Sequence, residues 1–337
     1  MHFFSDNAAR ACLEVLEAVM AANEVTRGSY DGDAISARLD GVFGEFFGHD
    51  CTVFPVSTGT AANALALAAL VPPYGAVVCH EEAHIEVDEA GAPEFFTGGA
   101  KLILAEGEGA ILTPETVAQS VAALRGDVHQ VQAGALSITQ ASEYGRVYSA
   151  DQVAALSETA KGRGWHLHMD GARFANALVH LGCHPGDITW RAGVEVLSFG
   201  FIKNGGMSAE ALIFFDRDLA ATVPHRRKRA GQMPSKGRFA AAQLIAMIES
   251  GAWERNARAA NDGAAKLAAA LGDRLMHRVE ANEVFVTIGT ENAAKLRAQG
   301  FDFYDWGNEG SGEARLVVAW DTPAEDIDAL AAAIDAL

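Results

Sequence analysis

Short apolar runs alternate with alanine- and leucine-rich stretches over the first two thirds of the chain. Short runs rich in β-branched side chains are typical of buried strands, and the alanine-rich stretches favour helices. Strands that alternate with helices predict an α/β fold with a mostly parallel sheet covered by helices. The predicted strands are residues 52–56, 76–79, 101–104, 130–138, 165–169, 194–198 and 211–215, and the predicted helices between them include 61–70, 114–124 and 149–163.

The pattern changes after a basic stretch at residues 225–236. Two alanine-rich helices are expected next, at about 237–250 and 253–271. Strands at 284–288 and 315–320 and a helix that starts at Pro323 follow them. This order predicts a smaller α+β domain, against which an N-terminal helix at residues 7–25 is expected to pack. We therefore expect an N-terminal segment (1–25), a large domain (26–236) and a small C-terminal domain (237–337).

The chain carries 26 lysines and arginines against 44 aspartates and glutamates, a formal net charge of −18. Nucleic acids and anionic membranes attract basic surfaces, so neither is an expected partner. The N-terminus lacks the basic start and apolar core of a signal peptide, and the apolar helix at 61–71 is too short to span a bilayer. We expect a cytoplasmic protein without a metal site, since Cys12, Cys51, Cys79 and Cys183 have no metal-ligand spacing.

Three segments with candidate chemistry each follow a predicted strand. The first, Ser57-Thr58-Gly59-Thr60, lies between a strand and an alanine-rich helix. The start of a helix offers unpaired N–H groups and the positive end of the helix dipole, which together suit a phosphate group. Simple capping of the helix by a hydroxyl group is the alternative.

The second segment, His166-Leu-His168-Met-Asp170-Gly-Ala-Arg173, ends another strand. Asp170 is expected at the carboxyl edge of the sheet, where ligands bind in parallel α/β folds. It would either stabilise a turn or pair with a ring nitrogen. Arg173 would either hold a carboxylate through two parallel hydrogen bonds or form a bridge with Asp170. The two histidines are interpreted as structural, because no third ligand completes a metal site.

The third segment, Ser198-Phe-Gly-Phe-Ile-Lys203-Asn-Gly-Gly, places a single lysine among apolar residues and glycines. Burial lowers the pKa of an amine and makes it a better nucleophile; an exposed loop lysine is the alternative. A helix start, an acidic strand end and a buried lysine together provide what pyridoxal 5′-phosphate (PLP) requires. They match its phosphate, its ring nitrogen and its aldehyde carbon. The three segments therefore predict a PLP enzyme.

Nearly the whole chain resembles the low-specificity L-threonine aldolases, in the threonine aldolase branch of the fold-type-I PLP enzymes. HMDGAR and SFGFIKNG are specific to this branch, whereas STGT alone is a weak signal. The resemblance implies an aspartate-aminotransferase-like fold, PLP as cofactor and a homotetramer (a dimer of dimers) that shares sites between subunits. The matching segments are FFSDNA, STGTAAN, EEAHIEVDEAGA, HMDGARFANA, SFGFIKNGG, KRAGQMPSKGRF and RLVVAW.

The resemblance also implies roles for single residues. Lys203 would carry the cofactor, Asp170 would pair with its pyridinium nitrogen, and His84 would stack on its ring and help to deprotonate the substrate β-hydroxyl group. The alternatives are a strand-end histidine bonded to backbone for His84 and an edge salt bridge for Arg315. The other implied contacts are Thr58, Gly59 and Thr60 to the phosphate, Ser5, Arg173 and Arg315 to the substrate carboxylate, Arg173 to the cofactor, and Arg229 to the cofactor region of a neighbouring subunit.

Three positions depart from the family pattern. Ile202 is apolar where a small hydroxyl residue is expected, which removes one expected phosphate contact. Gln232 stands where this branch often has histidine. In TQASEYGRV, either Gln140 or Glu143 takes the place of a histidine that lies near the substrate in some aldolases. These departures concern the pocket for the substrate side chain and leave the cofactor prediction unchanged.

The expected reaction is retro-aldol cleavage of a β-hydroxy-α-amino acid, such as L-threonine or L-allo-threonine, to glycine and an aldehyde. β-Elimination, transamination and cleavage of a phenylserine-like substrate are alternatives on the same fold. A non-catalytic binding protein is disfavoured by the presence of Lys203, Asp170 and Arg173. A nicotinamide-dependent oxidoreductase is disfavoured because no GxGxxG motif follows a predicted strand.

Overall fold

A seven-stranded sheet forms the centre of the computed structural model, which describes all 337 residues. The strands lie in the order β1-β7-β6-β5-β4-β2-β3. The five strands from β3 to β6 are parallel, and β7 runs antiparallel to its neighbours β6 and β1. This confirms the predicted α/β class. The strands are β1 Thr52–Val56, β2 Gly75–His80, β3 Lys101–Ala105, β4 Gln132–Thr139, β5 His166–Gly171, β6 Val196–Phe199 and β7 Glu210–Phe214.

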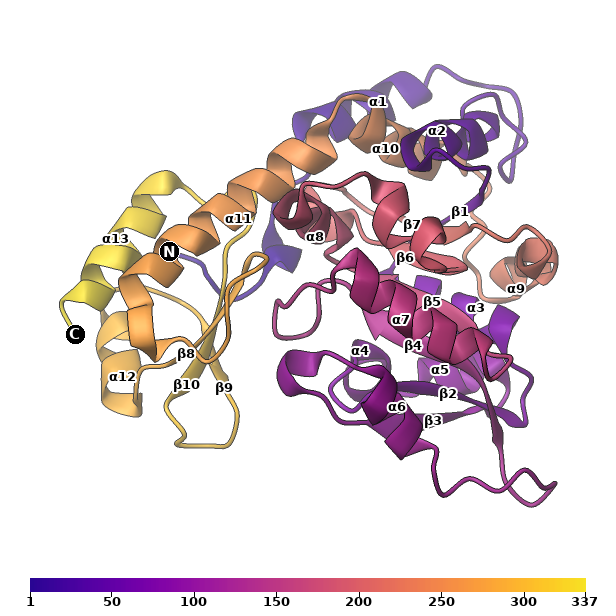
Figure 1. The fold of residues 1–337 in the computed structure, drawn as a ribbon. Helices are drawn as coiled ribbons and strands as arrows, with labels where there is room; N and C mark the ends of the chain where they lie inside the picture. The colour runs from indigo at the N-terminus through magenta and orange to yellow at the C-terminus, as the bar shows by residue number, and fades with distance from the viewer.

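Helices cover both faces of this sheet (Figure 1). Residues of α3 and α9 pack on one face, and residues of α2, α6, α7, α8 and α10 pack on the other. None of the helices is both long and apolar enough to cross a membrane. The helices are α1 Leu13–Ala22, α2 Leu39–Phe47, α3 Gly59–Leu70, α4 His84–Val87, α5 Ala92–Thr97, α6 Pro114–Ser120, α7 Ala150–Lys161, α8 Phe174–Leu181, α9 Val223–Arg229, α10 Arg238–Glu249, α11 Ala252–Leu271, α12 Thr290–Ala298 and α13 Ala324–Asp335.

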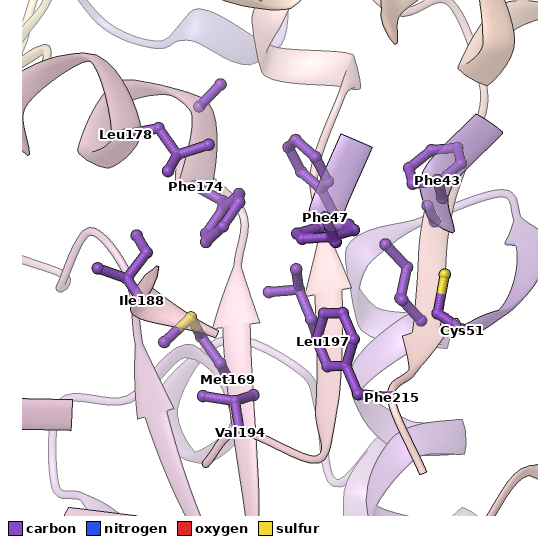
Figure 2. Packing of buried hydrophobic residues seen from close by; sticks show 14 of the residues in the cluster. Phe43, Phe47, Cys51, Met169, Phe174, Leu178, Ile188, Val194, Leu197 and Phe215 are labelled. Atoms are coloured by element: carbon purple, nitrogen blue, oxygen red, sulfur yellow. The ribbon is translucent and has the colours of Figure 1, made fainter. Parts of the chain in front are cut away.

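The main core lies between the sheet and α2, α8 and α10, and it is rich in phenylalanine. Figure 2 shows Phe47 of α2 directed toward Leu197 of β6 and Phe215. The rings of Phe47 and Phe215 meet edge to face with their centroids 5.0 Å apart, a favourable aromatic geometry. Deleting the fully buried Phe47 ring would cost about 3–5 kcal/mol of stability. This packing fixes the strands of the sheet relative to the helices that cover them.

A second, three-stranded antiparallel sheet in the order β8-β10-β9 lies beside the first (Figure 1). Its strands are β8 Glu283–Thr287, β9 Tyr304–Trp306 and β10 Glu313–Val317. Together with α11, α12 and α13 it encloses a separate apolar cluster. Helix α11, 20 residues long, extends about 30 Å from α10 to this smaller unit, so it links the two parts of the molecule.

The N-terminal segment differs from the prediction of one helix over residues 7–25. Ser5 caps a single 3-10 turn, η1 Asp6–Ala8, and the helix α1 begins only at Leu13. Between them the backbone is extended at Cys12, whose N–H bonds to the carbonyl of Gly205. Phe3 packs in the cluster of the small sheet, while Cys12 contributes to the main core. The segment thus contacts both units, and the division of the chain at residues 25 and 236 stays a prediction.

Candidate active site

A cavity of about 280 Å³ opens at the carboxyl edge of the parallel strands, near the lower limit of small-molecule sites. Strands β4, β5 and β6 end side by side there, with Thr139 opposite Asp170 and Asp170 opposite Ser198. Its walls include most of the residues singled out in the sequence. These are Thr58, Gly59, Thr60, His84, Asp170, Arg173 and Lys203.

The first turn of α3 forms one wall of the cavity. Thr58 caps this helix, and its hydroxyl group accepts the N–H of Ala61 at 3.1 Å. Thr58 therefore does cap the helix, as the alternative interpretation expected. The cap provides an acceptor for only one of the N–H groups in the first turn, and such groups have no partner within a helix. Gly59 and Thr60 both line the cavity, and a Cβ built on Gly59 meets nothing within 4 Å, so the backbone at the start of α3 is open to a ligand. This geometry suits an anionic group.

Asp170 lies one residue before the end of β5, and both of its carboxylate oxygens accept hydrogen bonds. Oδ2 accepts from Nδ2 of Asn63 at 2.7 Å, and Oδ1 accepts from the N–H of Ala172 at 2.9 Å. These two hydrogen bonds fix the orientation of the carboxylate. Asp170 does not bridge to Arg173, since the ion pairs of Arg173 go to Asp6 and Glu283. A fixed negative charge therefore lies against the cavity.

Lys203 lies on η6 (Ile202–Asn204), in the loop that joins β6 to β7. The structure contains no hydrogen bond or ion pair of its amine. Burial lowers its pKa, and the nearby positive charge of Arg173 lowers it further. The loop is held by the buried Glu210 of β7, whose Oε2 accepts the N–H groups of Phe201 and Ile202. Lys203 is thus a fixed amine facing a cavity and has the properties of a nucleophile.

His84 begins α4 on the opposite wall of the cavity. Its ring Nδ1 lies 2.9 Å from Oε1 of the buried Glu89. Its main-chain N–H donates to Oε1 of Glu143 at 3.1 Å. The hydrogen bond with Glu89 raises the pKa of His84 against the opposing effect of burial. Burial also raises the pKa of Glu143 to about 7. Two ionisable groups whose pKa values are both raised therefore adjoin one another here.

Arg173 forms a bidentate pair with Asp6, with Nε to Oδ2 at 2.8 Å and the second nitrogen to Oδ1 at 3.0 Å. Its third nitrogen lies 3.0 Å from Oε2 of Glu283. Arg173 does bind a carboxylate in the predicted manner, but in this structure the carboxylate belongs to the protein. A guanidinium has five N–H donors, so Arg173 keeps donors for a further acceptor.

Three predicted residues lie outside the cavity wall. Ser5 caps η1 through its hydroxyl group. Arg315 of β10 lies 4.0 Å from Glu283 and against the rings of Tyr304 and Trp306. Both residues lie near the ion-pair partners of Arg173: Ser5 precedes Asp6 in the chain, and Arg315 is on β10, which pairs with the strand of Glu283. Arg229, at the end of α9, lines a separate hollow. Their roles toward substrate and cofactor stay predictions.

The residues that depart from the family pattern can be located in the structure. Ile202 and Glu143 both line the cavity. Gln140 is fully buried, and its amide bonds the N–H and carbonyl of Tyr148. Of the two candidates, Glu143 is therefore the one next to the ligand space. Gln232 accepts the N–H of Ser57 at 2.8 Å and so supports the approach to α3 from outside the cavity.

His166 and His168 both form internal contacts, in line with a structural interpretation. His166 pairs with Glu195 at 3.0 Å. His168 is completely buried between the hydroxyl groups of Ser137 and Ser198, at 2.9 and 3.0 Å. Burial lowers the pKa of His168 to about 4, so its ring stays neutral beneath the site.

Several residues with direct contacts to the site were not singled out in the sequence. Asn63 is a buried amide in an otherwise apolar helix, which is a signal that could have been used. Glu89 lies within the EEAHIEVDEAGA segment but without a distinctive pattern. Asp6 and Glu283 act on Arg173, which is far away from both in the sequence. Glu210 acts on the N–H groups of Phe201 and Ile202, nine and eight residues before it, but this role was not inferred from the sequence.

The fold and the site together define a class. One cavity at the edge of the mostly parallel seven-stranded sheet is lined by the start of α3, the carboxylate of Asp170 and the unpaired amine of Lys203. These groups match an anionic phosphate, a protonated ring nitrogen and an aldehyde, so the residues present fit PLP. This is the architecture of the fold-type-I PLP enzymes.

Comparisons with known proteins identify the branch. The chain belongs to the beta-eliminating lyase family, which matches residues 2–291, and within it to the low specificity L-threonine aldolases, which are lyases. It is 45% identical over 333 residues to a low specificity L-threonine aldolase of Pseudomonas aeruginosa, covering 98% of this chain and 95% of the relative.

Comparisons with solved structures support the same family and fold. A threonine aldolase of Leishmania major matches with a TM-score of 0.93 at 25% identity, covering 99% of this chain and 98% of that one. A Thermus thermophilus aspartate aminotransferase matches with a TM-score of 0.70 at 16% identity, covering 99% and 91%. The second likeness concerns the fold alone, and it confirms the aspartate-aminotransferase-like architecture.

Proposed function

We propose that this chain is a PLP-dependent aldolase that cleaves L-threonine, L-allo-threonine and related β-hydroxy-α-amino acids to glycine and an aldehyde. The observation that carries the proposal is the single cavity that holds the unpaired amine of Lys203, the fixed carboxylate of Asp170 and the start of α3. Membership of the threonine aldolase family favours retro-aldol cleavage over the other reactions of this fold.

The chain's own residues would hold the cofactor at three points. Lys203 would bind its aldehyde carbon, Asp170 its ring nitrogen, and the N–H groups of Gly59 and Thr60, with the hydroxyl groups of Thr58 and Thr60, its phosphate. His84 lines the wall from which a ring could be covered. When bound, PLP supplies an electron sink for the electron pair released at the substrate α-carbon.

The substrate carboxylate would be bound by Arg173, with Arg315 and Ser5 nearby. Arg173 is held rigidly by Asp6 and Glu283, so binding a substrate requires little reorganisation of its side chain. Fixing the carboxylate orients the α-carbon and thereby selects which of its bonds is aligned for cleavage. In an aldolase this is the bond to the β-carbon.

His84 would take the proton of the β-hydroxyl group. Its side chain is 41% exposed and faces the cavity, and a histidine near neutral pH is suited to general base catalysis. Loss of this proton allows the oxygen to form the carbonyl group of the leaving aldehyde. Lys203, whose pKa is lowered by burial, lies in the same cavity and is available to move protons at the α-carbon.

Product analysis tests the function. PLP-loaded protein given L-threonine should form glycine and acetaldehyde in equal amounts, with no 2-oxobutyrate or ammonia, and a Lys203→Ala variant should form neither product. Formation of 2-oxobutyrate and ammonia would instead identify an eliminating lyase. Cleavage of phenylserine to benzaldehyde without cleavage of threonine would keep the reaction class and change the substrate.

Two further properties belong to the same proposal. The resemblance to tetrameric aldolases supports a homotetramer, in which Arg229 would reach the cofactor region of a neighbouring subunit. The acidic composition, with a net charge of −18, is in keeping with a cytoplasmic location. Sedimentation of the purified protein tests the first property, and cell fractionation tests the second.

A further inference from the structure

Glu89 is a buried carboxylate for which the proposed reaction has no use so far. It follows α4 closely in the chain, and its side chain is 0% exposed while it lines the inner wall of the cavity. A buried charge is costly unless hydrogen bonds compensate it. The contacts of Glu89 therefore indicate what it does.

One oxygen of Glu89 connects two sides of the site. Oε1 lies 2.9 Å from Nδ1 of His84 and accepts Nδ2 of Asn63, also at 2.9 Å. The same Asn63 nitrogen donates its other hydrogen to Oδ2 of Asp170 at 2.7 Å. A continuous chain of hydrogen bonds thus runs from His84 through Glu89 and Asn63 to Asp170.

This chain of hydrogen bonds determines where His84 carries its proton. A carboxylate has acceptors only, and Oε1 of Glu89 already receives an amide hydrogen from Asn63. Nδ1 of His84 must therefore be the donor in the contact with Oε1. A neutral imidazole protonated on Nδ1 has its lone pair on Nε2.

We propose that Glu89 is a positioning residue, which holds the proton of His84 on Nδ1 and so leaves Nε2 as the atom that accepts the proton of the substrate β-hydroxyl group. This inference rests on the proposed aldolase function. Asn63 fixes Glu89 in turn and ties its orientation to Asp170. The base and the carboxylate that faces the cofactor are then aligned by one network.

The charge of Glu89 also affects the titration of His84. Its hydrogen bond is the main cause that raises the pKa of His84, while burial lowers it. The other charged groups facing His84 are Asp170 of β5, which raises the pKa, and Lys203 of η6, which lowers it. Glu143 contacts the main-chain N–H of His84. Removing the charge of Glu89 should therefore move the titration of His84 to lower pH.

Comparison of Glu89→Gln with Glu86→Gln tests the proposal. Glu86 lies on the same short helix as His84 but is exposed, so the control makes the same chemical change outside the network. In protein with ¹³C-labelled histidine, the signal of His84 is assigned by its loss in His84→Gln. Its titration midpoint should move to lower pH in Glu89→Gln. In Glu86→Gln it should stay unchanged.

Kinetics of the loaded enzyme give a second readout. In Glu89→Gln the acidic limb of the pH profile of kcat/KM should move in the same direction, and kcat should fall by about tenfold or more. KM for L-threonine should change by less than about twofold. A lower kcat with an unshifted His84 midpoint and an unshifted acidic limb would mean a merely structural role and would overturn the proposal.

A measurement on the wild-type protein needs no variant. The ¹⁵N chemical shifts of the neutral His84 ring report which nitrogen carries the hydrogen, and hydrogen on Nδ1 is expected. Hydrogen on Nε2 would overturn the proposal directly. If the wild-type enzyme does not cleave threonine, the proposed function fails, and the shifts still report separately which ring nitrogen of His84 carries the hydrogen.

Discussion

Arg173 and Asp6 form a bidentate ion pair that joins positions 167 residues apart in the chain. Asp6 lies in a 3-10 turn of the N-terminal segment, and Arg173 follows β5, the strand that contains Asp170. The side chains are 1% and 11% exposed. The pair therefore attaches the N-terminal segment to the wall of the active-site cavity.

We expect Asp6→Asn to lower the free energy of unfolding at pH 7 by about 3 kcal/mol, because it leaves Arg173 with an incomplete set of partners. Burial alone would raise the pKa of Asp6, but the charge of Arg173 lowers it to about 2. The stabilisation is complete above the unfolded pKa of 3.8 and is lost as the pH falls toward 2. Denaturant titrations at pH 7 and pH 3.5 should show a smaller difference at the lower pH. Asp50→Asn, in an exposed pair with Arg217, should change little.

Lys203→Ala should abolish the covalent attachment of PLP. Borohydride treatment followed by mass spectrometry should find the cofactor fixed to the peptide that contains Lys203 in the wild-type protein and to no peptide in the variant. The exposed Lys236 provides a control, and Lys236→Ala should behave as wild type. Cofactor fixed to another lysine in Lys203→Ala would refute this assignment.

Asp170→Asn should retain the fold and reduce kcat by about 100-fold or more. The variant keeps the shape of the side chain and an oxygen for Asn63, but it loses the negative charge beside the ring nitrogen of the cofactor. Circular dichroism would establish the fold, and steady-state kinetics with L-threonine would measure the rate. Turnover close to that of the wild type would exclude Asp170 from this role.

Arg315→Ala and Arg173→Ala should both raise KM for L-threonine, by about 10- to 150-fold for the loss of a charge-assisted pair worth about 1.5–3 kcal/mol. Their effects on stability should differ. Arg173→Ala leaves the buried carboxylates of Asp6 and Glu283 unpaired and should cost about 3–5 kcal/mol. Arg315 approaches Glu283 only at 4.0 Å, so Arg315→Ala should cost less. An unchanged KM in Arg315→Ala would place the carboxylate site elsewhere.

His168 should make the protein less stable in mild acid. Burial lowers its pKa from 6.5 to about 4, so the unfolded chain binds the proton more readily between these values. Stability should therefore fall as the pH decreases from about 6.5 to 4, by about 3 kcal/mol from this residue. The difference in unfolding free energy between wild type and His168→Gln should shrink over this range. His166, whose pKa is raised by Glu195, should show the opposite trend.

The residues proposed to face the cofactor could be singled out in the sequence because they lie at or just after the ends of strands. Parallel strands end at one edge of a sheet, so Asp170 and the Lys203 loop had to lie near one another, and the structure brings them together with Thr58 in one cavity. The positions of the strands could also be predicted from the sequence, because buried parallel strands are continuous apolar runs.

The partners of these residues were not predictable in the same way. Glu210 holds the Lys203 loop, and Glu283 faces Arg173, but nothing local distinguishes either from an exposed glutamate. Only the tertiary fold brings Glu283 to Arg173, whereas Glu210 lies in the strand that directly follows the Lys203 loop. Helix α2 was missed because its sequence, LDGVFGEFF, contains glycines and aromatic residues of low helix propensity. Strand β9 was missed because it is a three-residue edge strand with mostly exposed side chains.

The antiparallel pairing of β1 with β7 has a consequence for synthesis on the ribosome. Val56, two residues before the cap residue Thr58 of α3, is paired with Glu210, which follows Lys203 in the chain. The two strands of this pair are separated by all the other strands of the large sheet in sequence, so the contact has a high loop-closure cost. The cavity can therefore close only after β7 has left the exit tunnel. Nascent chains arrested before Phe214 should be unable to retain the cofactor, and cofactor capture would mark the moment at which the whole sheet has formed.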